Sequence, residues 1–208
     1  GVSNIAIGKD ALDINTTGGN NVAVGINALG RNVDTDGNTA VGTSSLGVNV
    51  AANNSAVGFN ALAGNTTGTS NVAVGKDALQ DNTTGDANTA IGYQALLEAT
   101  TTHDNTAVGY YALKNLTTGA GNVAVGKAAL ANNQGSANIG VGFGALQANT
   151  TGTRNIAIGY TAYDGSDTEN DNLAIGYAAM TTNTAGGEKN VAIGNYALDA
   201  LTDGDTNT

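Results

Sequence analysis

The sequence predicts an all-β protein, a parallel β-roll or β-solenoid of twelve turns with about 17 residues each. The motif Asn-x-Ala-(Ile/Val)-Gly-x-x-Ala-Leu recurs twelve times, and successive motif Gly residues lie 16 to 18 positions apart. The residue before this Gly is always β-branched, and the rest of each unit is polar and rich in turn formers. A short fixed period is typical of solenoids, because one unit cannot bury its own apolar face without its neighbours.

Each unit begins with an Asn four positions before the Gly, and we divide the chain at these residues. The whole of 1–208 is then one repeat domain. The pair Asn207-Thr208 stands where a thirteenth unit begins, so we expect the chain to be a fragment of a longer fibre. The twelve units start at Asn4, Asn21, Asn38, Asn54, Asn71, Asn88, Asn105, Asn122, Asn138, Asn155, Asn172 and Asn190. We expect this Asn column to be structural, either as a ladder of stacked amides or as a tight corner.

The regular part of each unit reads as a strand rather than a helix. An amphipathic helix needs apolar residues at i, i+3, i+4 and i+7, and Gly and β-branched residues weaken it. In a strand, alternate side chains point to opposite faces. The β-branched residues therefore share one face of the predicted strand, and the small Ala and Gly residues share the other.

We expect the β-branched column to form the core of the coil, because stiff branched side chains pack well on a pleated surface. This column consists of Ile7, Val24, Val41, Val57, Val74, Ile91, Val108, Val125, Val141, Ile158, Ile175 and Ile193.

We expect the Ala column to form the oligomer face, because small residues permit close approach of a neighbouring backbone. This column consists of Ala6, Ala23, Ala40, Ala56, Ala73, Ala90, Ala107, Ala124, Ala157, Ala174 and Ala192, with Gly140 in the ninth unit. A strand that is apolar on both faces is normally covered on both, yet a thin coil has only one interior. We therefore predict a homo-oligomer, preferably a homotrimer around a common axis.

Two groups of known repeats share this pattern. The segments NIAIGKDA at 4–11 and NIAIGYTA at 155–162 resemble YadA-like head repeats of trimeric autotransporter adhesins. The segment NTAVGYYAL at 105–113 is also similar to shaft repeats of bacteriophage tail fibres. The resemblance covers the whole chain and implies a left-handed parallel β-roll wound as a trimer, located outside the cell on a virion or cell surface.

The composition narrows the function classes. The chain has no Cys, so disulfides and thiolate metal sites are excluded. Its formal charge of −10 would repel nucleic acid, and no apolar run is long enough to cross a membrane. We expect no cofactor, no metal, no nucleic-acid partner and no membrane insertion.

An aromatic column follows the motif Gly, and it supports two interpretations. An exposed ladder of rings can stack on sugars, which suits contact with a cell-surface glycan or receptor. The alternative, which we favour, is a cover over the apolar seam of the roll, because Tyr buries its ring while its hydroxyl stays wet. The column consists of Phe59, Tyr93, Tyr110, Phe143, Tyr160 and Tyr177, with Tyr111 and Tyr196 one place later.

Other polar groups give weak signals. The corner at 164–172 carries Asp164, Asp167, Glu169 and Asp171, but their spacing fits no calcium loop, and a solvated acidic turn is the simpler interpretation. The only histidine, His103, has no nucleophile beside it in sequence. Glycosylation sequons at Asn15, Asn53, Asn65, Asn82, Asn115 and Asn149 arise from a composition rich in Asn and Thr.

These observations predict a non-enzymatic structural and adhesive fibre segment that spaces or presents a receptor-binding tip. One alternative is an ice-binding β-solenoid, although the Thr-Thr-Gly corner it needs occurs in only five units. A second alternative is a tailspike that degrades polysaccharide with a carboxylate pair, for which Asp167 and Glu169 are the candidates.

Overall fold

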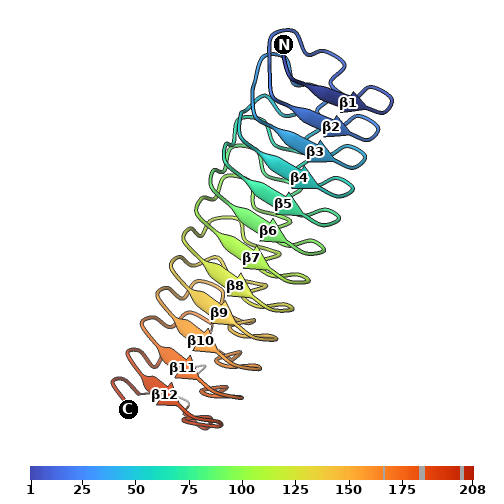
Figure 1. Ribbon diagram of the computed structural model, residues 1–208. Helices are drawn as coiled ribbons and strands as arrows, with labels where there is room; N and C mark the ends of the chain where they lie inside the picture. The colour runs from blue at the N-terminus through green and yellow to red at the C-terminus, as the bar shows by residue number, and fades with distance from the viewer. Residues whose placement is uncertain (166, 183–185, 202–203) are drawn as a thin grey trace. The chain divides into compact units, whose positions relative to one another are not determined.

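The computed structural model describes residues 1–165, 167–182, 186–201 and 204–208 as a parallel β-solenoid, and these residues contain no helix. The all-β solenoid class predicted from the sequence is therefore confirmed. No helix in the described part of the chain could cross a membrane. The chain consists of two compact units, Gly1–Asp104 and Asn105–Thr208. Each unit is a continuous series of the same coils (Figure 1).

In the first unit, six strands form a parallel sheet in chain order, with each strand hydrogen-bonded to the next. They are β1 (Ile5–Ile7), β2 (Val22–Val24), β3 (Thr39–Val41), β4 (Ser55–Val57), β5 (Val72–Val74) and β6 (Thr89–Ile91). The pairing joins equivalent residues of successive turns, as in Ala23 with Ala40. The repeat in the sequence is therefore also the register of the sheet.

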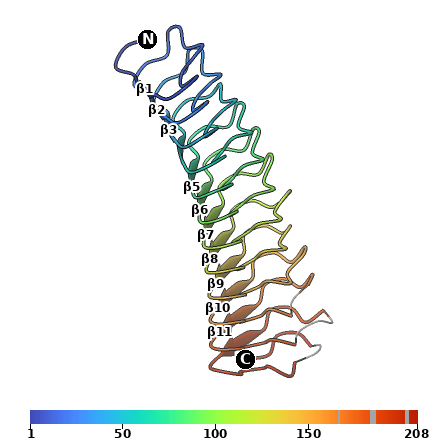
Figure 2. The same ribbon diagram turned by 90° about the vertical axis from the view of Figure 1, so that its right-hand side faces the viewer.

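The second unit repeats this arrangement with six further strands, again parallel and in chain order. They are β7 (Thr106–Val108), β8 (Val123–Val125), β9 (Ile139–Val141), β10 (Ile156–Ile158), β11 (Leu173–Ile175) and β12 (Val191–Ile193). In both units the strands form one wall of the coil, and the turns and corners form the remainder (Figure 2).

The burial of the two strand faces is the reverse of our expectation. The Ala column, predicted as an oligomer face, lies inside its own coil: Ala23, Ala40, Ala56, Ala73, Ala90, Ala107, Ala124, Ala157 and Ala174 are fully buried, Ala192 is nearly so, and Ala6 in the first turn is exposed. The β-branched column, predicted as core, points outward and is half-buried or exposed throughout, including Ile7, Val24, Val41, Val57, Val74, Ile91, Val108, Val125, Val141, Ile158, Ile175 and Ile193.

The narrow cross-section of the coil explains this reversal. In most turns the interior already holds the buried Leu of the motif and the Ala before it, for example Ala78 and Leu79, together with buried Asn side chains. Only a small side chain fits at the centre of the strand that faces this filling. The larger β-branched residues are therefore placed on the outer face, where no neighbouring element of the same coil covers them.

The side chains of the Asn column bond to the backbone of the next turn, so the column combines the ladder and the corner that the sequence left open. The side-chain Oδ1 of Asn21 accepts the backbone N–H of Asn38 at 2.8 Å, and Asn38 Oδ1 accepts that of Asn54 at 2.9 Å. The Nδ2 of Asn54 donates to the carbonyl oxygen of Gly68 at 2.8 Å. Because a buried backbone group without a partner is costly, each Asn connects one turn to the next and closes a corner.

Two features of the structure require Gly in the motif: a positive φ angle and the close approach of the next turn. Gly58 has φ +139°, a conformation that L-residues with a side chain rarely adopt. A Cβ atom at this position would lie 2.5 Å from the carbonyl oxygen of Gly75 in the next turn. The positive φ recurs at the motif Gly of every turn, including Gly194, and explains why the sequence keeps Gly here.

Candidate interaction surfaces

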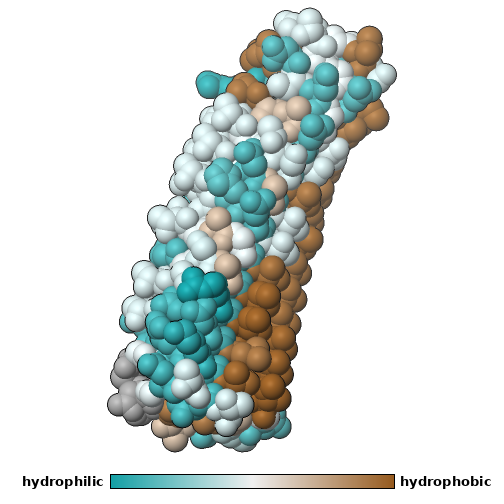
Figure 3. Space-filling view, turned by 90° about the vertical axis from the view of Figure 1, so that its left-hand side faces the viewer, coloured by the Kyte–Doolittle hydropathy of each residue, from teal (hydrophilic) through white to brown (hydrophobic). Residues whose placement is uncertain are grey.

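The outer face of the sheet is an apolar surface that runs along each unit and is left exposed. Two columns of each strand point outward, the β-branched column and the residue two positions before it. Neither column contains a charged residue in any strand. The contrast along one strand is sharp, since Ala90 is 0% exposed and Ile91 is 39% exposed. Hydrophobic side chains gather in a band along one side of the surface, beside polar corners (Figure 3).

The aromatic column forms a ladder in which the ring faces contact one another. In the second unit, the rings of Phe143 and Tyr160 stack with centroids 4.9 Å apart and planes 9° from parallel. Tyr160 and Tyr177 stack at 5.3 Å and 7°. Tyr160 therefore has a ring on each of its faces. Stacking on a sugar needs a free ring face, which Tyr160 lacks. The same residues are exposed, however, with Phe143 at 39%, Tyr160 at 48% and Tyr177 at 45%. The rings are therefore only partly buried, and the cover and the glycan contact both stay predictions.

Lysine side chains occupy the same ladder where an aromatic residue is missing. Lys76 Nζ lies 5.8 Å from the ring centroid of Phe59 and 5.2 Å from that of Tyr93, in the first unit. Lys127 Nζ lies 5.7 Å from the ring of Tyr110 and 5.6 Å from that of Phe143, in the second unit. Cation–π attraction of this kind is worth about 0.5–1 kcal/mol at exposed sites. The column therefore stabilises the stacking of the turns.

The acidic corner at 164–172 does not bring its carboxylates to one centre. Glu169 is buried, and its carboxylate accepts backbone N–H groups from Asp167 at 2.9 Å, Thr168 at 3.1 Å and Gly186 at 3.1 Å. Asp167 accepts the hydroxyl of Thr150. No group of three His, Asp or Glu residues among the described positions could hold a metal ion. This geometry supports neither a calcium site nor a pair of catalytic carboxylates.

The other two carboxylates of this corner have pKa values that are shifted in opposite directions. Asp171 accepts two hydrogen bonds from the guanidinium of Arg154, at 2.6 and 2.9 Å, and these lower the pKa of Asp171. The pKa of Asp164 is raised, mainly because burial disfavours its charged form. The Arg154–Asp171 pair connects successive turns on the surface, as expected for a structural contact.

His103 also has a structural contact. Its Nδ1 accepts the backbone N–H of Asp86 at 3.1 Å. The Asp86 carboxylate in turn accepts the backbone N–H of Thr69 at 2.6 Å and its hydroxyl at 2.9 Å, and these bonds lower the pKa of Asp86. This chain of contacts spans three successive turns and satisfies the backbone N–H groups of Thr69 and Asp86.

The corner Thr and Asn residues are used by the coil itself. The hydroxyls of Thr16, Thr66 and Thr83 donate to carbonyl oxygens of the next turn at 2.8 to 3.1 Å. An ice-binding face needs a regular array of hydroxyls turned to water, so these bonds weigh against that alternative. Of the sequon Asn residues, Asn65, Asn82 and Asn149 are fully buried and cannot accept a glycan in the folded coil.

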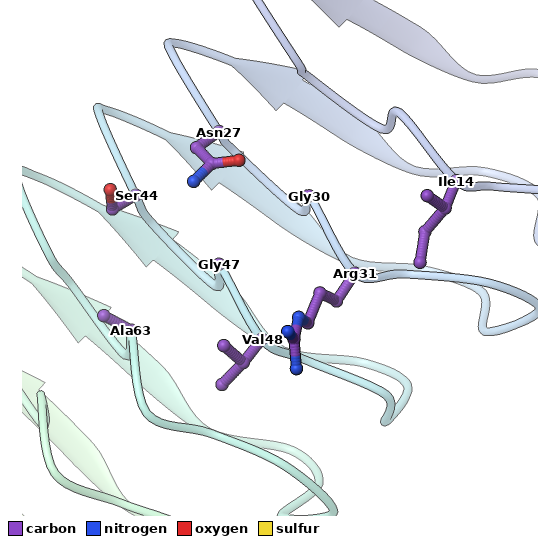
Figure 4. A pocket seen from close by; sticks show the side chains of 8 residues that line it. All are labelled: Ile14, Asn27, Gly30, Arg31, Ser44, Gly47, Val48 and Ala63. Carbon is purple, nitrogen blue, oxygen red and sulfur yellow. The ribbon is translucent and has the colours of Figure 1, made fainter.

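The sequence did not indicate a groove of about 630 Å³ in the first unit. Its lining residues all lie outside the strands: Ile14, Asn27, Gly30, Arg31, Ser44, Gly47, Val48 and Ala63 (Figure 4). Gly30, Gly47 and Ala63 follow the motif Leu, a position that holds Asp13, Gln80 and Leu97 in other turns of this unit. Because Gly and Ala replace larger residues at this position in three successive turns, the volume of the larger side chains is left as the groove. Comparing the residues after the motif Leu from turn to turn could have indicated it.

Comparison with known proteins adds no relative to these observations. No family model, no curated protein and no solved structure matches this chain.

Proposed function

We propose that this chain is a segment of an extracellular structural and adhesive fibre, in which three parallel copies cover one another's outer sheet face. The fibre spaces or presents a receptor-binding tip on a virion or cell surface and performs no catalysis. The turns wind with a left hand, as the resemblance to adhesin heads and tail-fibre shafts implies. The observation that carries the proposal is the outer sheet face, which is uncharged, repeats at every turn and is apolar apart from Thr39, Ser55, Thr89 and Thr106.

A second copy of the chain is the partner that fits this face best. Strands within the sheet are spaced by about 4.8 Å. Another copy has the same spacing and can place a strand opposite every strand of the first. A chain with formal charge −10 would repel its copies through its charged surfaces. The outer sheet face carries no charge, so association through it avoids the closest repulsion and buries apolar side chains.

The burial of the two strand faces changes the residues through which we expect the copies to contact one another, and it supports their assembly. The Ala column lies inside the coil, where it cannot touch a sister chain. The residues of the outer face, such as the half-buried Val72 and the exposed Val74, replace it in the proposal. Large apolar faces that are left uncovered on one chain typically mark interfaces.

Light scattering and a charged substitution on the outer face test this proposal. We expect the purified chain to have about three times the 20.4 kDa mass of one copy. Val74→Lys should reduce the mass toward one copy while the circular dichroism spectrum stays that of a β-solenoid. Val50→Lys is the control, because Val50 is also exposed but lies outside the strands. A native chain that is monomeric at high concentration would contradict the proposal.

A further inference from the structure

The groove in the first unit contains a guanidinium that no carboxylate among the described residues neutralises. The chain has two arginines. Arg154 is held by the carboxylate of Asp171 through two hydrogen bonds. Arg31 is exposed, and none of the described residues forms an ion pair or side-chain hydrogen bond with it. An unpaired guanidinium is notable in a chain with seventeen acidic residues and seven basic ones.

The other polar side chains of the groove are also free to bind a ligand. The side-chain amide of Asn27 and the hydroxyl of Ser44 form no hydrogen bond with the described residues, although the backbone N–H groups of both are used between turns. Both side chains stand on the groove wall formed by the turns after β2 and β3 (Figure 4). The groove therefore offers one fixed positive charge, an amide and a hydroxyl.

Apolar side chains complete the lining. Ile14 and Val48 flank Arg31 in the same column of neighbouring turns, and Ile14 is exposed (Figure 4). The volume of about 630 Å³ lies within the roughly 300–1,000 Å³ typical of small-ligand sites. Apolar walls with a few polar groups are the usual composition of such sites.

We propose that this groove binds a sugar that carries a carboxylate, such as a uronic acid residue of an acidic polysaccharide. The planar guanidinium of Arg31 can donate two parallel hydrogen bonds to a carboxylate. Asn27 and Ser44 can bond ring hydroxyls, and Ile14 and Val48 can cover the apolar C–H face of the ring. A simple carboxylate would contact only the Arg31 guanidinium. A neutral sugar would use only the polar side chains and the apolar side chains.

This inference is independent of the fibre proposal, because no lining residue belongs to a strand of the outer sheet face. It places a lateral ligand contact in the first unit. The groove depends on small residues at positions 30, 47 and 63, which are Asp13, Gln80 and Leu97 in other turns of that unit.

The test is a titration of the full chain with glucuronic acid, followed by NMR or calorimetry. Glucose and acetate are the comparison ligands. We expect glucuronic acid to bind at least about fivefold more tightly than either, since each satisfies only part of the lining. Equal affinity for acetate, equal affinity for glucose, or no binding of glucuronic acid would overturn the proposal.

Two variants locate the binding in the groove. Arg31→Gln should weaken glucuronic acid binding about tenfold or more, because the charged hydrogen bonds are lost. Gly47→Leu should abolish it by filling the groove. The fold should accept this change, because Leu97 occupies the equivalent position. A Cβ at 47 would lie 3.3 Å from the Ser44 carbonyl oxygen, so this oxygen has to shift by a few tenths of an ångström.

Arg154→Gln is the matched control, since it removes the other guanidinium far from the lining residues in sequence and should leave binding unchanged. Unaltered binding in Arg31→Gln or in a folded Gly47→Leu variant would refute the site. The mass of each sample, measured by light scattering, reports on the fibre proposal separately. A chain that forms trimers without binding glucuronic acid would refute only the groove.

Discussion

The side-chain amide of Asn82 donates to Oδ1 of Asn65 at 2.7 Å, but its own Oδ1 is buried without a hydrogen bond. These residues belong to a second column of Asn side chains that runs parallel to the one at the start of each unit. The next turn carries Ala99 where the column would continue. Thr102 Oγ1 is the other buried side-chain atom without a partner among the described residues.

Ala99→Asn should satisfy both atoms and stabilise the coil. The new Nδ2 would donate to Asn82 Oδ1, as Asn82 does to Asn65. The new Oδ1 would accept from Thr102 Oγ1, as Asn32 Oδ1 accepts from the hydroxyl of Thr35. We expect the free energy of unfolding, measured in urea, to rise by about 1–2 kcal/mol.

Ala99→Leu is the control for this change. It has similar bulk, and Leu116 shows that the repeat uses Leu at this position, but it leaves both polar atoms without partners. Equal stabilisation by Leu and Asn would mean that filled volume, and not hydrogen bonding, is responsible.

Ala73 and Val74 are neighbours in β5 with opposite surroundings, so substitution by Leu should destabilise the coil at Ala73 but not at Val74. Ala73 is fully buried inside the coil. Ala73→Leu should destabilise the coil itself by about 1–3 kcal/mol through overpacking. The measurement is thermal unfolding followed by circular dichroism. Val74→Leu on the outer face should change the stability of the coil little, and a larger loss for Val74→Leu than for Ala73→Leu would contradict the burial described above.

Ala87→Gly should stabilise the protein. Ala87 has φ +55°, in the left-handed region, which costs a residue with a Cβ roughly 1 kcal/mol. Gly121 occupies the equivalent place in the second unit with φ +67°, and a Cβ added there would meet no atom within 4 Å. Gly121→Ala should therefore be destabilising by a similar amount, for conformational reasons alone. Melting temperatures of the two variants should shift in opposite directions, and shifts of the same sign would contradict this explanation.

Asp164→Asn should stabilise the protein at pH 7 but not in acid. Burial raises the pKa of Asp164 above its ordinary value of 3.8, so the charged form opposes folding when the pH is above the folded-state pKa. The cost disappears once the pH falls below 3.8, because the group is then protonated in both states. We expect a gain of less than about 1 kcal/mol at pH 7, since the group is partly solvated.

Asp171→Asn is the counterpart with the opposite sign. The pKa of Asp171 is lowered in the folded chain, so the charged form of Asp171 favours folding. The Asn variant should therefore be less stable than the native chain at pH 7 and equally stable in strong acid. Urea unfolding at pH 7 and pH 3 compares all three proteins. A gain for Asp164→Asn that is undiminished at pH 3 would show that its charge is not the cause.

The repeat by itself determined the fold class, the strand positions and the pairing of equivalent residues. It could do so because a fixed period forces each turn to sit on the next in one register. The invariant Asn and Gly columns were identifiable for the same reason, since a role repeated at every turn selects the same residue at every turn.

Only the tertiary structure decided which strand face is inside. Side chains along Asn-x-Ala-Val-Gly point alternately to the two faces of the strand, and the residues on both faces are apolar or small. The sequence pattern therefore does not distinguish the inner face from the outer one. The space left by Leu79, Ala78 and the buried amides at each turn admits Ala73 and rejects Val74, and this is a matter of volume in three dimensions. The groove beside Arg31 was hidden for a related reason, since a missing side chain becomes a cavity only when the turns on either side of it are stacked.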